Sequence, residues 1–257
     1  MNPKTVPTTV SKYKRKHIVI EEAENTANMW IPRNWQQQWN NLLKMRESYN
    51  APVDTMGCER IADQNEEPKT FRYQVLLSLM LSSQTKDEIT SAAMTKLKNY
   101  GCNVDNILQM KITELEKLIY PVGFYKTKAK YIMKTTQTLK DDYDGDVPSN
   151  VEELCQLPGV GPKMAHLVMK CAWNKVTGIA VDSHVHKICN RLGWTRKTTK
   201  TPIETQREIE KWIPRELWSE VNYVMVGFGQ QLCLTNKPKC GTCLNKSTCL
   251  FPAGPRK

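Results

Sequence analysis

Apolar side chains recur through most of this chain at the spacing of an α-helix. One stripe follows Lys163 at positions i, i+3, i+4, i+7 and i+8, namely Met164, Leu167, Val168, Cys171 and Ala172. A second stripe comprises Val185, Ile188, Cys189 and Leu192. This spacing is typical of helices that bury one face, whereas the alternation typical of a half-buried strand is scarce. The pattern therefore predicts an all-α protein.

A third stripe predicts a helix with a strongly basic outer face. Its apolar positions are Ala129, Ile132, Met133, Thr136 and Leu139, and its polar side carries Lys126, Lys128, Lys130 and Lys134. We expect each of these lysines to lie in solvent, and a surface that faces phosphate groups is the alternative.

Several helix starts are marked by a hydroxyl residue with a glutamate three positions later, the pattern of a capping box. The pairs are Ser149 with Glu152, Thr85 with Glu88, and Thr113 with Glu116. Thr201 and Glu204 form a fourth pair, in which Pro202 would occupy the first helical position. The pair at Ser149 predicts a short helix that ends near Gln156.

The segment between that short helix and the first stripe has the composition of a phosphate-binding turn. It consists of Leu157-Pro158-Gly159-Val160-Gly161-Pro162-Lys163. Two glycines around one apolar residue allow a tight turn that brings backbone N–H groups close to an anion, and a helix N-terminus faces the same anion. We predict a helix-hairpin-helix unit that binds phosphate through Gly159, Val160 and Gly161 and places Lys163 beside it.

Lys163 is the candidate nucleophile of this unit. A lysine attacks only in its neutral form, and the helix dipole, worth about 0.3–1 kcal/mol, is too weak to remove the proton alone. Desolvation by a bound substrate would have to supply the rest. Asp182 is the candidate partner, because it directly precedes the second stripe and would cap that helix. A capping carboxylate can still present its second oxygen to a cleft.

Four cysteines form a C-x6-C-x2-C-x5-C array: Cys233, Cys240, Cys243 and Cys249. Such a cluster of thiols, interleaved with lysine, proline and glycine, is typical of a loop around a metal centre, either zinc or an iron–sulfur cluster. The single C-x2-C pair favours one [4Fe–4S] cluster over a zinc ribbon, which usually has two such pairs. The odd total of nine cysteines argues against disulfides and indicates a reducing compartment.

The charge of the chain indicates a polyanionic partner. It has 37 Lys and Arg against 26 Asp and Glu, a net charge of +11. A basic membrane-binding or ribosomal protein would share this charge. The longest strongly apolar run, from Val75 to Leu81, is far shorter than the ~20 residues of a membrane span, so no membrane partner is expected.

Residues 1–29 are expected to form a disordered basic tail. The first twenty residues contain no acid and include the cluster Lys12, Lys14, Arg15, Lys16 and His17. Such a cluster is typical of a nuclear import signal or a nonspecific DNA-binding arm. We expect the protein in the nucleus, with the mitochondrion as a second location.

The hairpin segment, the segment Val181-Asp182-Ser183-His184 and the cysteine array together resemble the endonuclease III family of DNA glycosylases and AP lyases, which belongs to the helix-hairpin-helix superfamily. Three further segments are similar to the eukaryotic members of that family: Tyr73–Asp87, Tyr120–Phe124 and Val226–Gln231. The resemblance extends from about Trp30 to Cys249, nearly the whole chain.

This resemblance implies two α-helical domains that flank a DNA-binding cleft. Residues 67–174 would form a helical barrel that carries the hairpin. Residues 30–66 and 175–257 would form a discontinuous second domain with the cysteine loop. Lys163 and Asp182 would then face each other across the cleft. A nucleotide that reaches both must leave the duplex stack, at a cost on the order of a few kcal/mol.

The resemblance also implies the reaction and its residues. Lys163 would attack C1′ of the extruded nucleotide and form a Schiff base, Asp182 would stabilise the positive charge at C1′, and β-elimination would cut the strand 3′ to the site. The substrates would be oxidised pyrimidines of the thymine glycol type and abasic sites in double-stranded DNA, bound by a monomer. Gln84 would fill the gap in the duplex, Phe124 would act as an apolar wedge, and His184 would approach the DNA.

Three other functions are compatible with parts of the sequence. A monofunctional adenine glycosylase of the same superfamily shares the cysteine array but lacks a lysine at the hairpin, so Lys163 argues against it. A non-catalytic DNA-binding protein would need only the hairpin turn, and a zinc-dependent nuclease would use the cysteines for zinc. The interpretation that we favour gives the cysteine loop a structural role, in which it presents Lys237 and Lys239 to phosphate, and redox sensing linked to DNA is the alternative.

Overall fold

The computed structural model describes residues 30–57 and 61–251, and every regular element in these ranges is helical. No residue of the described ranges lies in a β-strand. The predicted all-α class is therefore confirmed. The expected basic tail, residues 1–29, with its cluster at residues 12–17, lies outside the described residues.

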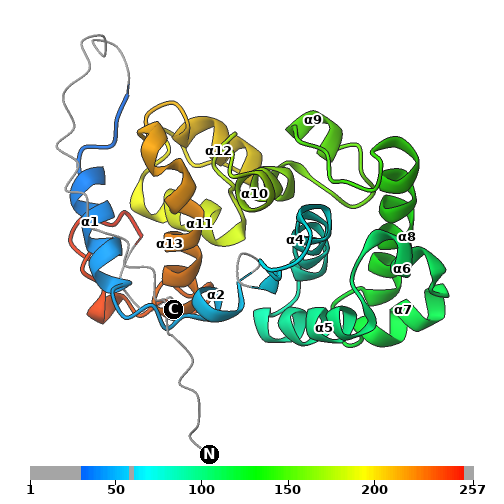
Figure 1. The fold of residues 1–257 in the computed structure, drawn as a ribbon. Helices are drawn as coiled ribbons and strands as arrows, with labels where there is room; N and C mark the ends of the chain where they lie inside the picture. Colours follow the sequence, from blue (N-terminus) through cyan, green and yellow to red (C-terminus); the bar gives the residue numbers. More distant parts are fainter. Residues whose placement is uncertain (1–29, 58–60, 252–257) are drawn as a thin grey trace, which may run out of the picture.

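The helices lie in two groups (Figure 1), and each group has its own cluster of buried apolar side chains. The first group comprises α4 (Pro68–Ser82), α5 (Asp87–Tyr100), α6 (Val104–Gln109), α7 (Ile112–Ile119), α8 (Tyr125–Asp142), α9 (Val151–Leu154) and α10 (Pro162–Trp173). The second comprises α1 (Trp35–Met45), α11 (Ser183–Leu192), α12 (Pro202–Ile209), α13 (Trp218–Gln231) and the 3-10 helices η1 (Arg215–Leu217) and η2 (Cys240–Thr242).

The short helix α2 (Pro52–Met56) lies between the two groups and packs against both α5 and α13 (Figure 1). Ile61 and Ala62 pack in the first cluster, although the expected division puts residues 30–66 in the second domain. The expected domain boundaries themselves stay a prediction.

The helix α4 occupies the centre of the first group because it is apolar on nearly all sides. Residues 73–81 are all buried, and α5, α8 and α10 pack around them. A helix of this kind is typical of the interior of a protein. None of the helices in the described ranges combines the length and the apolarity that a crossing of the bilayer requires.

The structure confirms the predicted helix start at Thr201 and corrects the other three predicted pairs. Thr201 caps α12, where its Oγ1 accepts a hydrogen bond from the N–H of Glu204 at 3.2 Å. At α9, Asn150 takes the place predicted for Ser149, and the N–H of Glu153 donates to its Oδ1 at 2.8 Å. Asparagine caps as well as serine and also has a glutamate three positions later, so the helix starts one residue later than predicted.

The other two corrections have different causes. At α7 the first turn begins after Lys111 rather than at Thr113, and Glu114 accepts a hydrogen bond from the Lys111 N–H at 3.0 Å. Thr85 caps no helix, because its Oγ1 instead accepts a hydrogen bond from the N–H of Gly123 at 3.1 Å. A contact between residues far apart in the chain thus replaces the local cap.

The helix α8 buries its predicted apolar stripe, but one expected surface lysine is buried with it. Lys126, Lys130 and Lys134 are exposed as expected, whereas Lys128 is only 7% exposed. The expectation of a solvated Lys128 is therefore wrong. The physical reason is that its ammonium group finds acceptors inside the protein, at the end of α4.

Candidate active site

The connection between α9 and α10 is the tight hairpin that its glycines predict. Gly159 has a φ of +82°, a conformation that favours glycine, and a Cβ there would lie 2.8 Å from Cδ2 of Tyr131. Thr135 Oγ1 fixes the turn from α8 by donating to the carbonyl of Pro158 at 3.1 Å. The side chain of Val160 is buried in the first cluster, so any contact of this residue with an anion is through its backbone.

Gly161 and Lys163 stand at the open N-terminus of α10. Gly161 is the N-cap, and a Cβ on it would have no atom within 4 Å. Pro162 fills the first helical position as predicted, and Lys163 is partly exposed in the first turn. The free space, the helix dipole and the lysine charge all favour a bound anion here.

Asp182 caps α11, as the second apolar stripe predicts. Its Oδ1 accepts a hydrogen bond from the N–H of Val185 at 2.8 Å. The cap uses one of the two carboxylate oxygens, and the residue is half-buried. The helix start therefore holds this carboxylate in one orientation through one of its two oxygens.

Sequence reasoning missed Asp87, a carboxylate at the junction of the two groups. It lies in the first turn of α5, and Gln230 of α13 donates to its Oδ2 at 2.9 Å. Burial raises the pKa of Asp87, and the Gln230 hydrogen bond and the charges of Lys163 and His184 oppose that rise without cancelling it. Lys163 of the first group and His184 of the second therefore both oppose the rise in the pKa of Asp87 through their charge. The available signal was its place at the end of the matching segment Tyr73–Asp87.

His184 lies two residues after Asp182, in the first turn of α11. Its ring packs against Gly229 of α13, where a Cβ would lie only 2.5 Å from the ring Nδ1. The glycine thus leaves room for the imidazole at the junction near Asp87. The expected contact of His184 with DNA stays a prediction.

Gln84 and Phe124, the two residues expected to enter the duplex, lie on adjacent loops. Both have a positive φ, 50° and 56°, and both are exposed, Phe124 to 67%. A Cβ on Gly123 would lie 2.6 Å from the carbonyl oxygen of Gln84, so the two loops meet backbone to backbone. An aromatic side chain with this exposure is not a core residue, and its position suits a wedge.

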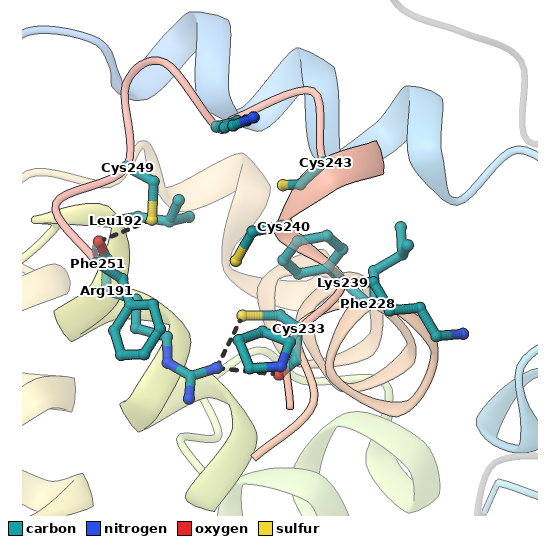
Figure 2. A pocket seen from close by; sticks show the side chains of 12 residues that line it. Arg191, Leu192, Phe228, Cys233, Lys239, Cys240, Cys243, Cys249 and Phe251 are labelled. Carbon is teal, nitrogen blue, oxygen red and sulfur yellow. Dashed lines mark hydrogen bonds between the residues drawn. The ribbon is translucent and has the colours of Figure 1, made fainter. Parts of the chain in front are cut away.

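The cysteine array lines one cavity of the second group, against α11 and α13 (Figure 2). Its four members are Cys233, Cys240, Cys243 and Cys249, and apolar walls come from Leu192, Phe228 and Phe251. No carboxylate or histidine is among the described residues that line this cavity. Lys239 lies at its rim, and Lys237 is exposed on the same loop.

Two of the four thiols form hydrogen bonds with Arg191. Arg191 Nη1 donates to Cys233 Sγ at 3.2 Å, and Cys249 Sγ donates to the Arg191 carbonyl at 3.2 Å. Burial raises the pKa of the Cys233, Cys243 and Cys249 thiols. A cation would offset this cost of the thiolate form, because it attracts the negative sulfurs.

The thiols do not converge on a point that would suit one ion. Within residues 30–57 and 61–251, no group of three or more Cys, His, Asp or Glu side chains is placed to hold a single metal ion. The four sulfurs nevertheless turn toward the same space in Figure 2. A donor set made only of thiols around a shared cavity suits zinc or an iron–sulfur cluster.

Comparison with known proteins agrees with this arrangement. Residues 77–215 match the family described as HhH-GPD superfamily base excision DNA repair protein. The chain belongs to this family. It is 52% identical to Endonuclease III-like protein 1 of Gallus gallus, over 95% of this chain and 89% of that protein. It is also 57% identical to Endonuclease III-like protein 1 of Mus musculus, over 92% of this chain and 82% of that protein.

A solved structure of a trapped endonuclease III–DNA covalent intermediate, in an estranged-adenine complex, has the same fold. The TM-score is 0.74 at 28% sequence identity, over 86% of this chain and 96% of that chain. These relationships confirm the resemblance stated above and make the protein a base excision repair DNA glycosylase and lyase of the endonuclease III type. The family match includes the hairpin, Lys163 and Asp182.

Proposed function

We propose that Lys163 and Asp182 carry out the glycosylase and lyase steps of this enzyme on oxidised pyrimidines of the thymine glycol type. One observation supports this assignment above all. Lys163 lies partly exposed in the first turn of α10, directly after the hairpin and at an open helix N-terminus where an anion would bind beside it. Asp182 caps α11 with one of its two carboxylate oxygens.

The reaction begins when the hairpin binds a phosphate near the damaged nucleotide. Backbone N–H groups of residues 159–161 and the N-terminus of α10 supply the contacts. The neutral Nζ of Lys163 attacks C1′ of the extruded sugar, and the bond from C1′ to the base breaks, so the base leaves with the electron pair. Asp182 stabilises the positive charge that develops at C1′.

The covalent intermediate then makes strand cleavage possible. A proton transfers to O4′, the sugar ring opens, and an iminium forms between C1′ and Lys163. The iminium withdraws electrons and acidifies the proton on C2′. A base removes that proton, the C3′–O bond breaks, and the 3′ strand leaves as a phosphate. Water hydrolyses the remaining imine and releases Lys163.

Double-stranded DNA is the partner of this reaction. An oxidised pyrimidine with a saturated ring stacks poorly, so its extrusion costs less free energy than that of an intact base. Abasic sites need no base release: the amine of Lys163 would condense with the C1′ aldehyde of the open sugar, water would leave, and the same iminium would form. We infer that the chain acts as a monomer, since α10 and α11, which carry Lys163 and Asp182, belong to one chain.

Trapping with borohydride tests the assignment of Lys163. The protein is incubated with thymine glycol duplex, and a covalent adduct should form with the wild type and with Lys126→Gln, an exposed lysine on α8. Lys163→Gln should still bind the duplex but form no adduct and cut no strand. Base release without strand cleavage by the wild type would instead indicate a monofunctional glycosylase. Normal cleavage by Lys163→Gln would overturn the assignment.

We propose that Cys233, Cys240, Cys243 and Cys249 hold one [4Fe–4S] cluster. The all-sulfur lining of one cavity supports a metal centre here, and the single C-x2-C pair favours the cluster over zinc. When bound, the cluster would serve as a structural cross-link that holds the loop carrying Lys237 and Lys239 toward phosphate. Iron and sulfide analysis with visible absorption spectra tests it, with Cys240→Ser as the variant and Cys155→Ser as the control. Stoichiometric zinc without iron would contradict the proposal.

We propose the nucleus as the location of the protein, with the mitochondrion as a second location. The support is the basic cluster at residues 12–17, which lies outside the described residues. A fluorescent fusion in which these basic residues are replaced by alanine should lose nuclear accumulation. Unchanged nuclear accumulation of this variant would contradict a role of the cluster in import.

A further inference from the structure

The buried lysine of α8 reaches the loop that carries Gln84. Lys128 Nζ donates to the carbonyls of Leu81 and Ser83 at 2.7 and 2.5 Å and to Thr85 Oγ1 at 3.1 Å. These acceptors stand on both sides of Gln84 along the chain. All three hydrogens of the ammonium group therefore have acceptors in the segment around this residue.

Thr85 extends the connection to the loop of Phe124. Its Oγ1 accepts a hydrogen bond from the Gly123 N–H at 3.1 Å in addition to the one from Lys128. The carbonyl of Phe124 in turn accepts a hydrogen bond from the Lys128 N–H at 3.0 Å. Lys128 thus holds the Gln84 loop with its side chain, and Thr85 joins that loop to the Phe124 loop.

Fold stability alone does not account for a lysine at this position. The acceptors are two carbonyls and one hydroxyl, all neutral, and burial lowers the pKa of Lys128 to about 8. An apolar side chain of similar length would fill the same space without the desolvation of a charge. The carbonyls at the C-terminal end of α4 do favour a cation, since the helix dipole is negative there.

The backbone conformations of Gln84 and Phe124 have to be stabilised by contacts with other residues. Gln84 and Phe124 both have a positive φ, which is unfavourable for residues other than glycine and persists only where the surrounding structure enforces it. Both side chains are exposed, so their own packing does not supply that hold. The hydrogen bonds of Lys128 and Thr85 connect the two loops to the end of α4 and to each other.

We propose that Lys128 is a positioning residue that holds Gln84 and Phe124 in one fixed arrangement, so that both enter the duplex as a unit. This inference rests on the proposed function, in which Gln84 fills the gap and Phe124 acts as the wedge. Preorganised loops lose less conformational freedom when DNA binds, so a larger share of the contact energy remains for extrusion of the base.

The test compares a substrate whose cleavage should require insertion of Gln84 and Phe124 with one whose cleavage should not. One is a duplex with thymine glycol, and the other is a single strand with an abasic site, which has no partner strand and no gap to fill. Lys128→Met should cut the duplex about tenfold more slowly than the wild type in single turnover and the single strand within about twofold. Lys130→Met, an exposed neighbour on α8, should match the wild type on both.

A fluorescence measurement tests the same proposal without base release or strand cleavage. In a duplex with a non-cleavable abasic analogue opposite 2-aminopurine, the fluorescence change on binding should be strong for the wild type and reduced for Lys128→Met. This signal separates the two proposals, because a wrong nucleophile would leave the fluorescence change intact. If both rates of Lys128→Met fall in parallel with the folded fraction and the fluorescence change is unaltered, Lys128 has no positioning role.

Thr85→Val covers the case in which Lys128→Met does not fold, since it removes the shared hydroxyl and keeps the side-chain shape. We expect the same selective loss on the duplex. A double-mutant cycle with Gln84→Ala adds a further criterion. The Lys128→Met change should have little effect once Gln84 is absent, because the two residues act together. Fully additive effects would contradict the proposal.

Discussion

Gln230 donates a hydrogen bond of 2.9 Å to Asp87 and thereby joins α13 of the second group to α5 of the first. Its amide oxygen accepts from the Val53 N–H of α2 at 3.1 Å, so three helices meet at this side chain. Because Asp87 also interacts electrostatically with Lys163, the connection holds the two groups together beside the candidate nucleophile.

Replacement of Gln230 by leucine should destabilise the protein in a pH-dependent manner. Burial raises the pKa of Asp87, so its ionised form lowers the free energy of unfolding above that pKa. The lost hydrogen bond to a charged group is worth about 1.5–3 kcal/mol. We expect a loss of about 1–2 kcal/mol near pH 7 and a smaller loss near pH 4, where more Asp87 is protonated. Urea unfolding at both pH values measures this, with the exposed Gln156→Leu as control. An equal loss at both pH values would be evidence against it.

Two substitutions of Asp182 should distinguish its role as the N-cap of α11 from the role of its negative charge in base release. Asparagine caps helices as well as aspartate, so Asp182→Asn should retain the bond to Val185 and nearly all of the stability. It should nevertheless slow base release about 100-fold or more in single turnover, since the charge at C1′ is no longer stabilised. Asp182→Ala should lose the same activity and also about 1 kcal/mol of stability. A fully active Asp182→Asn would show that the carboxylate only caps the helix.

The two hairpin glycines should respond differently to alanine. At Gly159 a Cβ would meet Tyr131 at 2.8 Å in a backbone conformation with φ +82°, so Gly159→Ala should cost about 1–3 kcal/mol of stability. At Gly161 the space is open, and Gly161→Ala should cost less than about 1 kcal/mol. Thermal unfolding measures both. Filter binding should show weaker DNA affinity for Gly161→Ala despite its intact fold, and unchanged affinity would exclude close backbone contact with phosphate there.

The buried ion pair between Arg46 and Asp54, 2.6 Å apart, should make the fold sensitive to acid. Burial alone would raise the pKa of Asp54, but hydrogen bonds from Arg46, Tyr223 and the Ala51 N–H outweigh it and lower the pKa. A carboxyl with a lowered native pKa stabilises the fold above its unfolded pKa of 3.8, and this contribution is lost as the pH falls through the native pKa.

Asp54→Asn should therefore be strongly destabilising near neutral pH. It leaves the Arg46 guanidinium buried without its carboxylate, at a cost of about 3–5 kcal/mol. The difference from the wild type should shrink as the pH falls below about 4, since the unfolded wild type then binds a proton that the native carboxylate does not yet accept, and it should be smallest once the pH is below the native pKa. Chemical unfolding across this pH range measures it. Asp105→Asn, which breaks an exposed pair with Lys140, serves as control and should leave stability unchanged.

Local patterns in the sequence were sufficient for much of the fold. The start of α10 at Pro162 and the cap at Asp182 were both predicted, because an apolar stripe, a proline and a capping side chain act within one helical turn. The same local pattern misplaced the start of α9, because Ser149 and Asn150 are both good caps and only the packed helix selects between them.

What the sequence by itself determined was which residues are helical, where the hairpin turns, and which side chains can act as nucleophile and thiol ligand. Tertiary structure decided which of them meet. Lys128 belongs to the polar side of its helix by pattern, yet carbonyls at the end of α4, more than forty residues earlier in the chain, bury its charge. Asp87 became part of the site only through Gln230 of α13. Contacts between distant segments depend on how the helices pack, and periodicity within one helix carries no information about that packing.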